Sequence, residues 1–162
     1  MSIRIKRLTE NFAAEIYGVN LSKKISTRDF SDIKNAFEEY SILVFPNQPL
    51  TDEQQVVFSK RFGDLENTIN SKQQGGAGKP VTVLTNVGKN GEVIAPEDRR
   101  MVFNTGNQMW HTDSSFKPIP AMMSLLSGRE VPPEGGETEF ASMRAAYEDL
   151  DNDQKNELEQ LI

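Results

Sequence analysis

Apolar residues recur at spacings of three and four between residues 27 and 40, which predicts an amphipathic helix. Ser26 or Thr27 can cap its first turn, because a hydroxyl oxygen there accepts a hydrogen bond from an otherwise unpaired backbone N–H. Asp29 lies in the same turn, where a negative charge is favourable. The apolar stripe consists of Phe30, Ile33, Ala36, Phe37 and Tyr40.

Short apolar runs bounded by Gly, Pro and polar residues predict strands elsewhere in the chain. Residues 1–22 fit short strand pieces, and the run 42–45, which stops at a proline, fits a buried strand. Further strands are expected at 81–84, at 122–126 and from 138 to 140, with turns at 89–91 and 132–136.

A helix is expected behind Thr51, which forms a capping box with Gln54, and a short helix is expected over 143–150. Another is expected from Asp151 or Asn152 onward, where either residue can cap it. The last pattern continues to Ile162 without a glycine or proline stop. We therefore expect the chain to be part of a longer one. Its 162 residues suit one domain.

The amino-acid composition excludes several kinds of binding partner and site. The chain has 18 Lys and Arg against 24 Asp and Glu, and its net charge of −6 argues against nucleic acid or an anionic membrane. No secretory leader or membrane-spanning run is apparent, so we expect a cytoplasmic protein. The absence of cysteine excludes disulfides, thiolate metal sites and cysteine nucleophiles, and there is one histidine.

That histidine lies in the most informative stretch, Trp110-His111-Thr112-Asp113. If the stretch is extended, His111 and Asp113 share a face, and Trp110 points away from it into the core. An imidazole and a carboxylate on one face suit one edge of the two-histidine, one-carboxylate triad that binds non-haem Fe(II). The alternative is a turn or helix cap in which Asp113 accepts backbone hydrogen bonds and His111 is a packed surface residue.

The surrounding motifs WHTDSSF and SLLSGREVPPEGGETEFASMRAAYEDL resemble the taurine dioxygenase / 2,4-dichlorophenoxyacetate dioxygenase family of Fe(II)- and 2-oxoglutarate-dependent oxygenases. The resemblance extends through ILVFPNQPLTDEQQVVFSKRFGDLE and EIYGVNLS, and so covers nearly the whole chain. It implies a mixed α/β, mainly β fold, a double-stranded β-helix (jelly roll) with flanking helices that is incomplete at the C-terminus. Residues 1–162 would be the N-terminal part of a single oxygenase domain.

The resemblance also implies roles for individual residues. His111 and Asp113 take the places of two iron ligands and are the expected catalytic centre. Thr138 takes the place of the residue whose hydroxyl binds the distal carboxylate of 2-oxoglutarate. Asn107 matches a polar position near the co-substrate, and Asn86 one that lines the substrate pocket. Without the resemblance, the preferred interpretation of Thr138 is an ordinary strand residue, and that of either asparagine is a turn former.

The activity so implied is hydroxylation of a small organic acid, a carboxylate or a sulfonate, by O2 with release of succinate and CO2. The family's second iron-binding histidine and its arginine for 2-oxoglutarate have no counterpart in this chain. We therefore expect these 162 residues alone to bind Fe(II) weakly and to be inactive. The alternative is a truncated, non-catalytic fragment that acts as a binding or assembly module. The sequence leaves open whether the protein forms a homo-oligomer.

Overall fold

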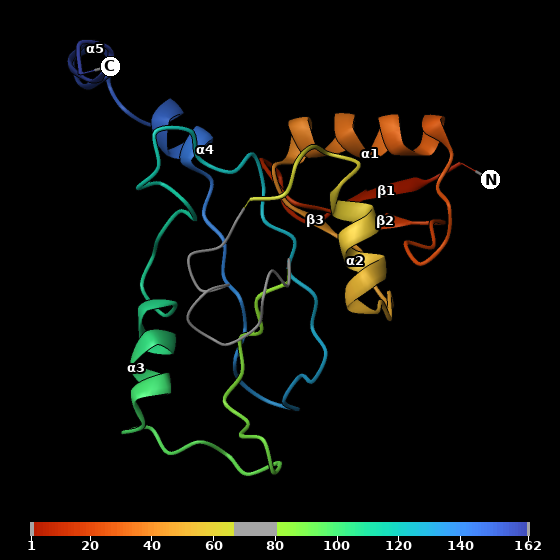
Figure 1. The fold of residues 1–162 in the computed structure, drawn as a ribbon. Helices are drawn as coiled ribbons and strands as arrows, with labels where there is room; N and C mark the ends of the chain where they lie inside the picture. Colours follow the sequence, from red (N-terminus) through yellow and green to blue (C-terminus); the bar gives the residue numbers. More distant parts are fainter. Residues whose placement is uncertain (1, 67–80, 162) are drawn as a thin grey trace. The chain divides into compact units, whose positions relative to one another are not determined.

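A computed structural model of the chain describes residues 2–66 and 81–161 (Figure 1). The chain divides into two compact units. Unit 1 comprises Met1–Thr51 with Gly128–Ile162, and unit 2 comprises Asp52–Ser127.

Unit 1 is built on a three-stranded sheet of β1 (Arg4–Arg7), β2 (Ala14–Tyr17) and β3 (Leu43–Val44), in that order. The central strand β2 runs antiparallel to β1 and parallel to β3, so the sheet is mixed. Ala14 and Ile16 of β2 are almost fully buried. The expected strand pieces near the N-terminus are thus confirmed, and β2 supplies the centre of the core.

Helix α1 (Thr27–Tyr40) lies along this sheet and closes the core (Figure 1). Ser26 is its N-cap, because its side-chain oxygen accepts a hydrogen bond of 3.0 Å from the backbone N–H of Asp29. Of the predicted stripe, Ile33 and Ala36 are buried. The predicted helix, its cap and its apolar face are therefore confirmed.

Two short helices complete unit 1, namely α4 (Met143–Glu148) and α5 (Asn152–Glu159). Asp151 and Gln154 form a capping box at the start of α5, in which each side chain accepts a hydrogen bond from the other residue's backbone N–H. Helix α4 is tied to α1, since Arg144 Nη1 donates a 2.6 Å hydrogen bond to the carbonyl of Glu38. Both helices were expected, and Asp151 was one of the two caps predicted for α5.

Unit 2 contains α2 (Asp52–Ser59) and α3 (Arg99–Gly106). Phe58 of α2 is buried and meets Phe62 edge to face at 5.3 Å. The predicted hairpin turn at 89–91 is confirmed by an antiparallel bridge between Val87 and Val93, with Gly91 at φ 84. Helix α3 was not expected from the sequence.

The segments 81–84, 122–126 and 138–140 do not form strands, which corrects the expectation. A strand needs a neighbour that accepts and donates its backbone hydrogen bonds, and an apolar run cannot specify that neighbour. Val83 and Leu84 are accordingly exposed. The run 42–45 was expected to be buried, yet β3 has only two residues and Val44 is 39% exposed. The described residues show a mixed α/β arrangement with a small sheet.

Within residues 2–66 and 81–161, no helix is both long enough and apolar enough to cross a membrane.

The β1–β2 pair carries an acid whose titration can be tested. Glu15 accepts hydrogen bonds from the Tyr17 hydroxyl at 2.6 Å and the Lys6 ammonium at 3.0 Å, which lower the pKa of Glu15 from its ordinary 4.5. Because the folded-state pKa is the lower one, the stabilisation is present above the unfolded value and is lost as the pH falls through the folded value. We expect an NMR titration of the Glu15 carboxyl to show the lowered pKa, and Tyr17→Phe to raise it. Tyr40→Phe, which removes a hydroxyl bonded to Arg7 instead, is the matched control.

An unchanged Glu15 pKa in Tyr17→Phe would contradict the prediction. A shift of equal size in the Tyr40→Phe control would mean that the hydroxyl bond of Tyr17 is not its cause.

Candidate metal centre

The His-x-Asp motif lies on an irregular segment of unit 2 that follows the end of α3 at Gly106. Turns lead into the segment and out of it, and His111 itself is in neither a helix nor a strand. Ser114, directly after Asp113, has a φ of 59, a left-handed conformation that is uncommon for a residue with a side chain. The segment is therefore shaped by turns and side-chain bonds, not by a sheet.

This segment nevertheless brings the two predicted ligand atoms together. Nε2 of His111 lies 3.4 Å from Oδ1 of Asp113. Nδ1 of His111 lies 2.7 Å from the carbonyl oxygen of Met109, which can only accept, so Nδ1 carries the proton of the neutral ring. The lone pair of Nε2 is then available beside a carboxylate oxygen, as metal coordination requires.

These donor atoms fit two of the three protein ligands of a facial Fe(II) triad. The side chains of His111 and Asp113 are 47% and 59% exposed, so an ion and further ligands have access to them. Residues 2–66 and 81–161 contain no group of three or more His, Cys, Asp or Glu that could hold a metal ion. The described residues thus supply two of the three protein ligands of such a centre.

Ser124 contacts this pair and was not identified from the sequence. Its hydroxyl donates a 2.6 Å hydrogen bond to Oδ2 of Asp113, the oxygen that does not face His111. A signal was present, because Ser124 is the polar residue inside the apolar run Met122-Met123-Ser124-Leu125-Leu126. Its partner, however, lies outside that run.

The turn after Asp113 is held by a second carboxylate, Glu66. Both oxygens of Glu66 accept from the Ser114 hydroxyl, at 3.0 and 2.8 Å, and the Lys117 ammonium forms an ion pair with the same side chain. The hydrogen bonds from Lys117 and then Ser114 lower the pKa of Glu66 below its ordinary value. Glu66 thereby stabilises the left-handed residue next to the predicted ligand.

The contacts described above involve none of the other predicted site residues. Asn107 follows α3 and is exposed, and Asn86 is exposed beside the hairpin, where its carbonyl accepts from the Ile94 N–H at 2.8 Å. Thr138 belongs to unit 1 and is exposed on an irregular stretch. Their roles stay predictions. Trp110 was expected in the core but is 70% exposed, since no strand alternation directs it inward.

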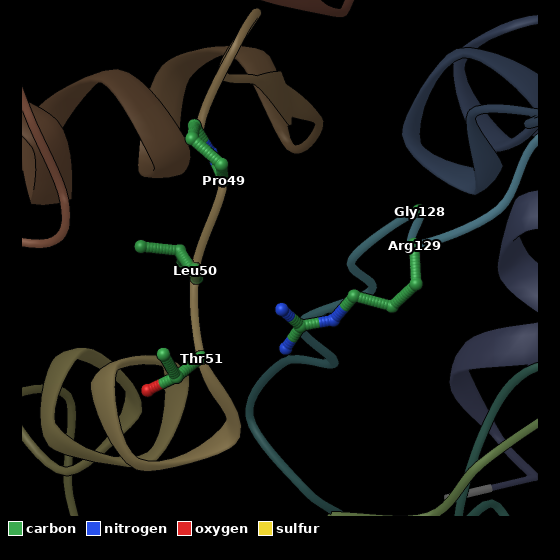
Figure 2. A pocket seen from close by; sticks show the side chains of 5 residues that line it. All are labelled: Pro49, Leu50, Thr51, Gly128 and Arg129. Carbon is green, nitrogen blue, oxygen red and sulfur yellow. The ribbon is translucent and has the colours of Figure 1, made fainter.

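Unit 1 contains a cavity of about 340 Å³ lined by Pro49, Leu50, Thr51, Gly128 and Arg129 (Figure 2). The Arg129 side chain extends toward the stretch that carries Leu50 and Thr51. The cavity is at the small end of the range for ligand sites. None of its lining residues is a predicted site residue.

Comparison with known proteins places the whole chain in one group. The family model described as "Taurine catabolism dioxygenase TauD, TfdA family" matches residues 4–162. The alpha-ketoglutarate-dependent 2,4-dichlorophenoxyacetate dioxygenase of Burkholderia sp. (strain RASC) is 37% identical over an alignment of 164 positions, which covers 99% of this chain and 55% of that protein. The (S)-phenoxypropionate/alpha-ketoglutarate-dioxygenase of Sphingobium herbicidovorans is 38% identical over 97% of this chain and 51% of its own length.

Solved structures agree with the sequence matches. The crystal structure of AAD-2 in complex with Mn(II) and N-oxalylglycine is 42% identical, with a TM-score of 0.85 over 98% of this chain and 54% of that one. A putative alpha-ketoglutarate dependent 2,4-D dioxygenase from Burkholderia xenovorans is 29% identical with a TM-score of 0.69. The chain spans about half the length of the proteins that it matches.

Proposed function

Because the chain belongs to the taurine catabolism dioxygenase TauD, TfdA family, we propose that it is the N-terminal part of a dioxygenase that hydroxylates a small organic acid. The resemblance read from the motifs is thereby confirmed, and Fe(II) and 2-oxoglutarate (alpha-ketoglutarate) are the metal and co-substrate of this family. Phenoxy acids in the names of the relatives support an acid as the substrate, either a carboxylate or a sulfonate.

The observation that carries the proposal is the 3.4 Å approach of Nε2 of His111 to Oδ1 of Asp113. In the proposed enzyme these two atoms bind Fe(II), and the Met109 carbonyl keeps the imidazole in the tautomer that leaves Nε2 free. Fe(II), when bound, supplies the redox chemistry with O2, which yields succinate, CO2 and the hydroxylated acid. The chain has one histidine, so the third protein ligand comes from outside these 162 residues.

The remaining predicted residues act on the two organic acids. The Thr138 hydroxyl donates to the distal carboxylate of 2-oxoglutarate, a charge-assisted hydrogen bond of about 1.5–3 kcal/mol. Asn107 lies near the co-substrate and Asn86 lines the substrate pocket. We propose that both units are parts of a single jelly-roll oxygenase domain, supported by the likeness to AAD-2 over 98% of the chain.

The test measures succinate formed from 2-oxoglutarate by the full-length protein with Fe(II), O2 and a panel of phenoxy carboxylates and alkyl sulfonates. We expect succinate formation that depends on one class of acid. The 162-residue chain is expected to give none, and to show only a weak charge-transfer band on anaerobic titration with Fe(II) and 2-oxoglutarate. Full-length protein with neither turnover nor this band would contradict the proposal and favour a binding or assembly module.

A further inference from the structure

We propose that Ser124 is a positioning residue whose hydroxyl holds Oδ2 of Asp113, so that Oδ1 faces a divalent metal ion beside Nε2 of His111. The inference rests on the proposed function and adds a residue to it. Ser124 does not touch the metal in this proposal. It acts through the carboxylate that does.

The two carboxylate oxygens of Asp113 have different neighbours. Oδ2 accepts the Ser124 hydroxyl at 2.6 Å, and Oδ1 lies 3.4 Å from Nε2 of His111. A carboxylate on a short side chain can rotate and exchange its oxygens when neither is bound. The Ser124 hydrogen bond removes that freedom, and it leaves the oxygen nearer the imidazole as the single donor.

Ser124 is suited to this task because its own segment is anchored. The carbonyl of the next residue, Leu125, accepts a 3.0 Å hydrogen bond from the Gln55 side chain of α2. Exposure alternates along 121–127, so that Ser124 lies on the more exposed face and Leu125 on the more buried one. A helix therefore holds the backbone from which the Ser124 hydroxyl reaches Asp113.

The backbone next to Asp113 is held as well. Ser114 follows it directly and is bound by both oxygens of Glu66, with Lys117 paired to the same carboxylate. These contacts hold the backbone of the turn, whereas Ser124 is the only residue in the ranges 2–66 and 81–161 whose hydroxyl donates to an Asp113 oxygen. The orientation of the carboxylate thus depends on Ser124 more than on the turn.

The single histidine makes a direct test practical. Selective isotope labelling of histidine gives one imidazole in the NMR spectrum. Because broadening by Mn(II) falls steeply with distance, an ion bound at this ring broadens its signals far more than an ion bound at acidic residues farther away, of which the chain has 24 in all. Mn(II) alone is titrated into the wild-type chain and into Ser124→Ala, and the broadening of the His111 signals is measured. We expect the affinity to fall about 10- to 100-fold in Ser124→Ala, the range for loss of a group that orients a metal ligand.

Two further variants separate orientation from general effects. Ser124→Thr keeps the hydroxyl and is expected to restore Mn(II) binding, which a merely structural loss would not do. Ser115→Ala removes an exposed hydroxyl from the turn after Asp113 and is expected to bind as the wild type does. Amide spectra of all variants check that the fold is kept.

The outcomes distinguish the two proposals. Equal broadening in wild type and Ser124→Ala would overturn the role of Ser124 and leave the metal pair standing. A wild-type chain whose His111 signals stay sharp at Mn(II) concentrations high enough to fill even a weak two-ligand site would overturn the metal pair itself, and the role of Ser124 with it. Both proposals are supported if Mn(II) binding is weaker in Ser124→Ala and is restored in Ser124→Thr.

Discussion

Replacing His111 with alanine in the full-length protein is expected to abolish substrate-dependent succinate formation. The imidazole is the sole histidine ligand that these 162 residues can offer, and its Nε2 lies 3.4 Å from the carboxylate oxygen of Asp113. Loss of a residue that only orients a ligand costs about 10- to 100-fold in affinity or activity, so loss of the ligand itself should cost more than about 100-fold. The measurement is the initial rate of succinate formation at saturating 2-oxoglutarate.

Gln108→Ala is the matched control for this variant. Gln108 is an exposed neutral residue three positions before the histidine, and it is not among the predicted ligands. It should keep most of the activity. Retention of most activity in His111→Ala would remove His111 from the metal centre and with it the observation on which the proposed function rests.

Local signals in the sequence were sufficient for the elements that depend on a few neighbouring residues. The hydroxyl of Ser26 and the carboxylate of Asp151 cap the helices that they were expected to cap, because a cap and its backbone partner lie three positions apart. The strands at 81–84, 122–126 and 138–140 were wrong for the opposite reason. Strand formation depends on a partner that is distant in the sequence.

The candidate site shows the same division. His111 and Asp113 are two positions apart, so their spacing alone suggested a shared face, even though the segment is not a strand. Ser124 lies eleven positions after Asp113, and Glu66 lies 48 positions before Ser114. Hydrogen bonds over those separations follow from the folded chain and cannot be read from local spacing.

Asp113→Glu is expected to be nearly as damaging as loss of the histidine, although it keeps the charge. The added methylene moves the carboxylate along the side chain, away from the place where Oδ1 meets His111 and Oδ2 meets Ser124. Misplacement of a catalytic group by about 1 Å can cost about 100-fold in rate. We expect a loss of that size in succinate formation, together with weaker Fe(II) binding at unchanged thermal stability.

The stability measurement matters because it separates displacement of a ligand from damage to the fold. Asp113 is 59% exposed, so a longer side chain there has room and should not disturb packing. Asp64→Glu, the same change at an exposed position of unit 2, is expected to leave activity and Fe(II) binding unaltered. An Asp113→Glu enzyme that turns over like the wild type would mean that the reaction does not depend on where this carboxylate lies, which is incompatible with Asp113 as a metal ligand.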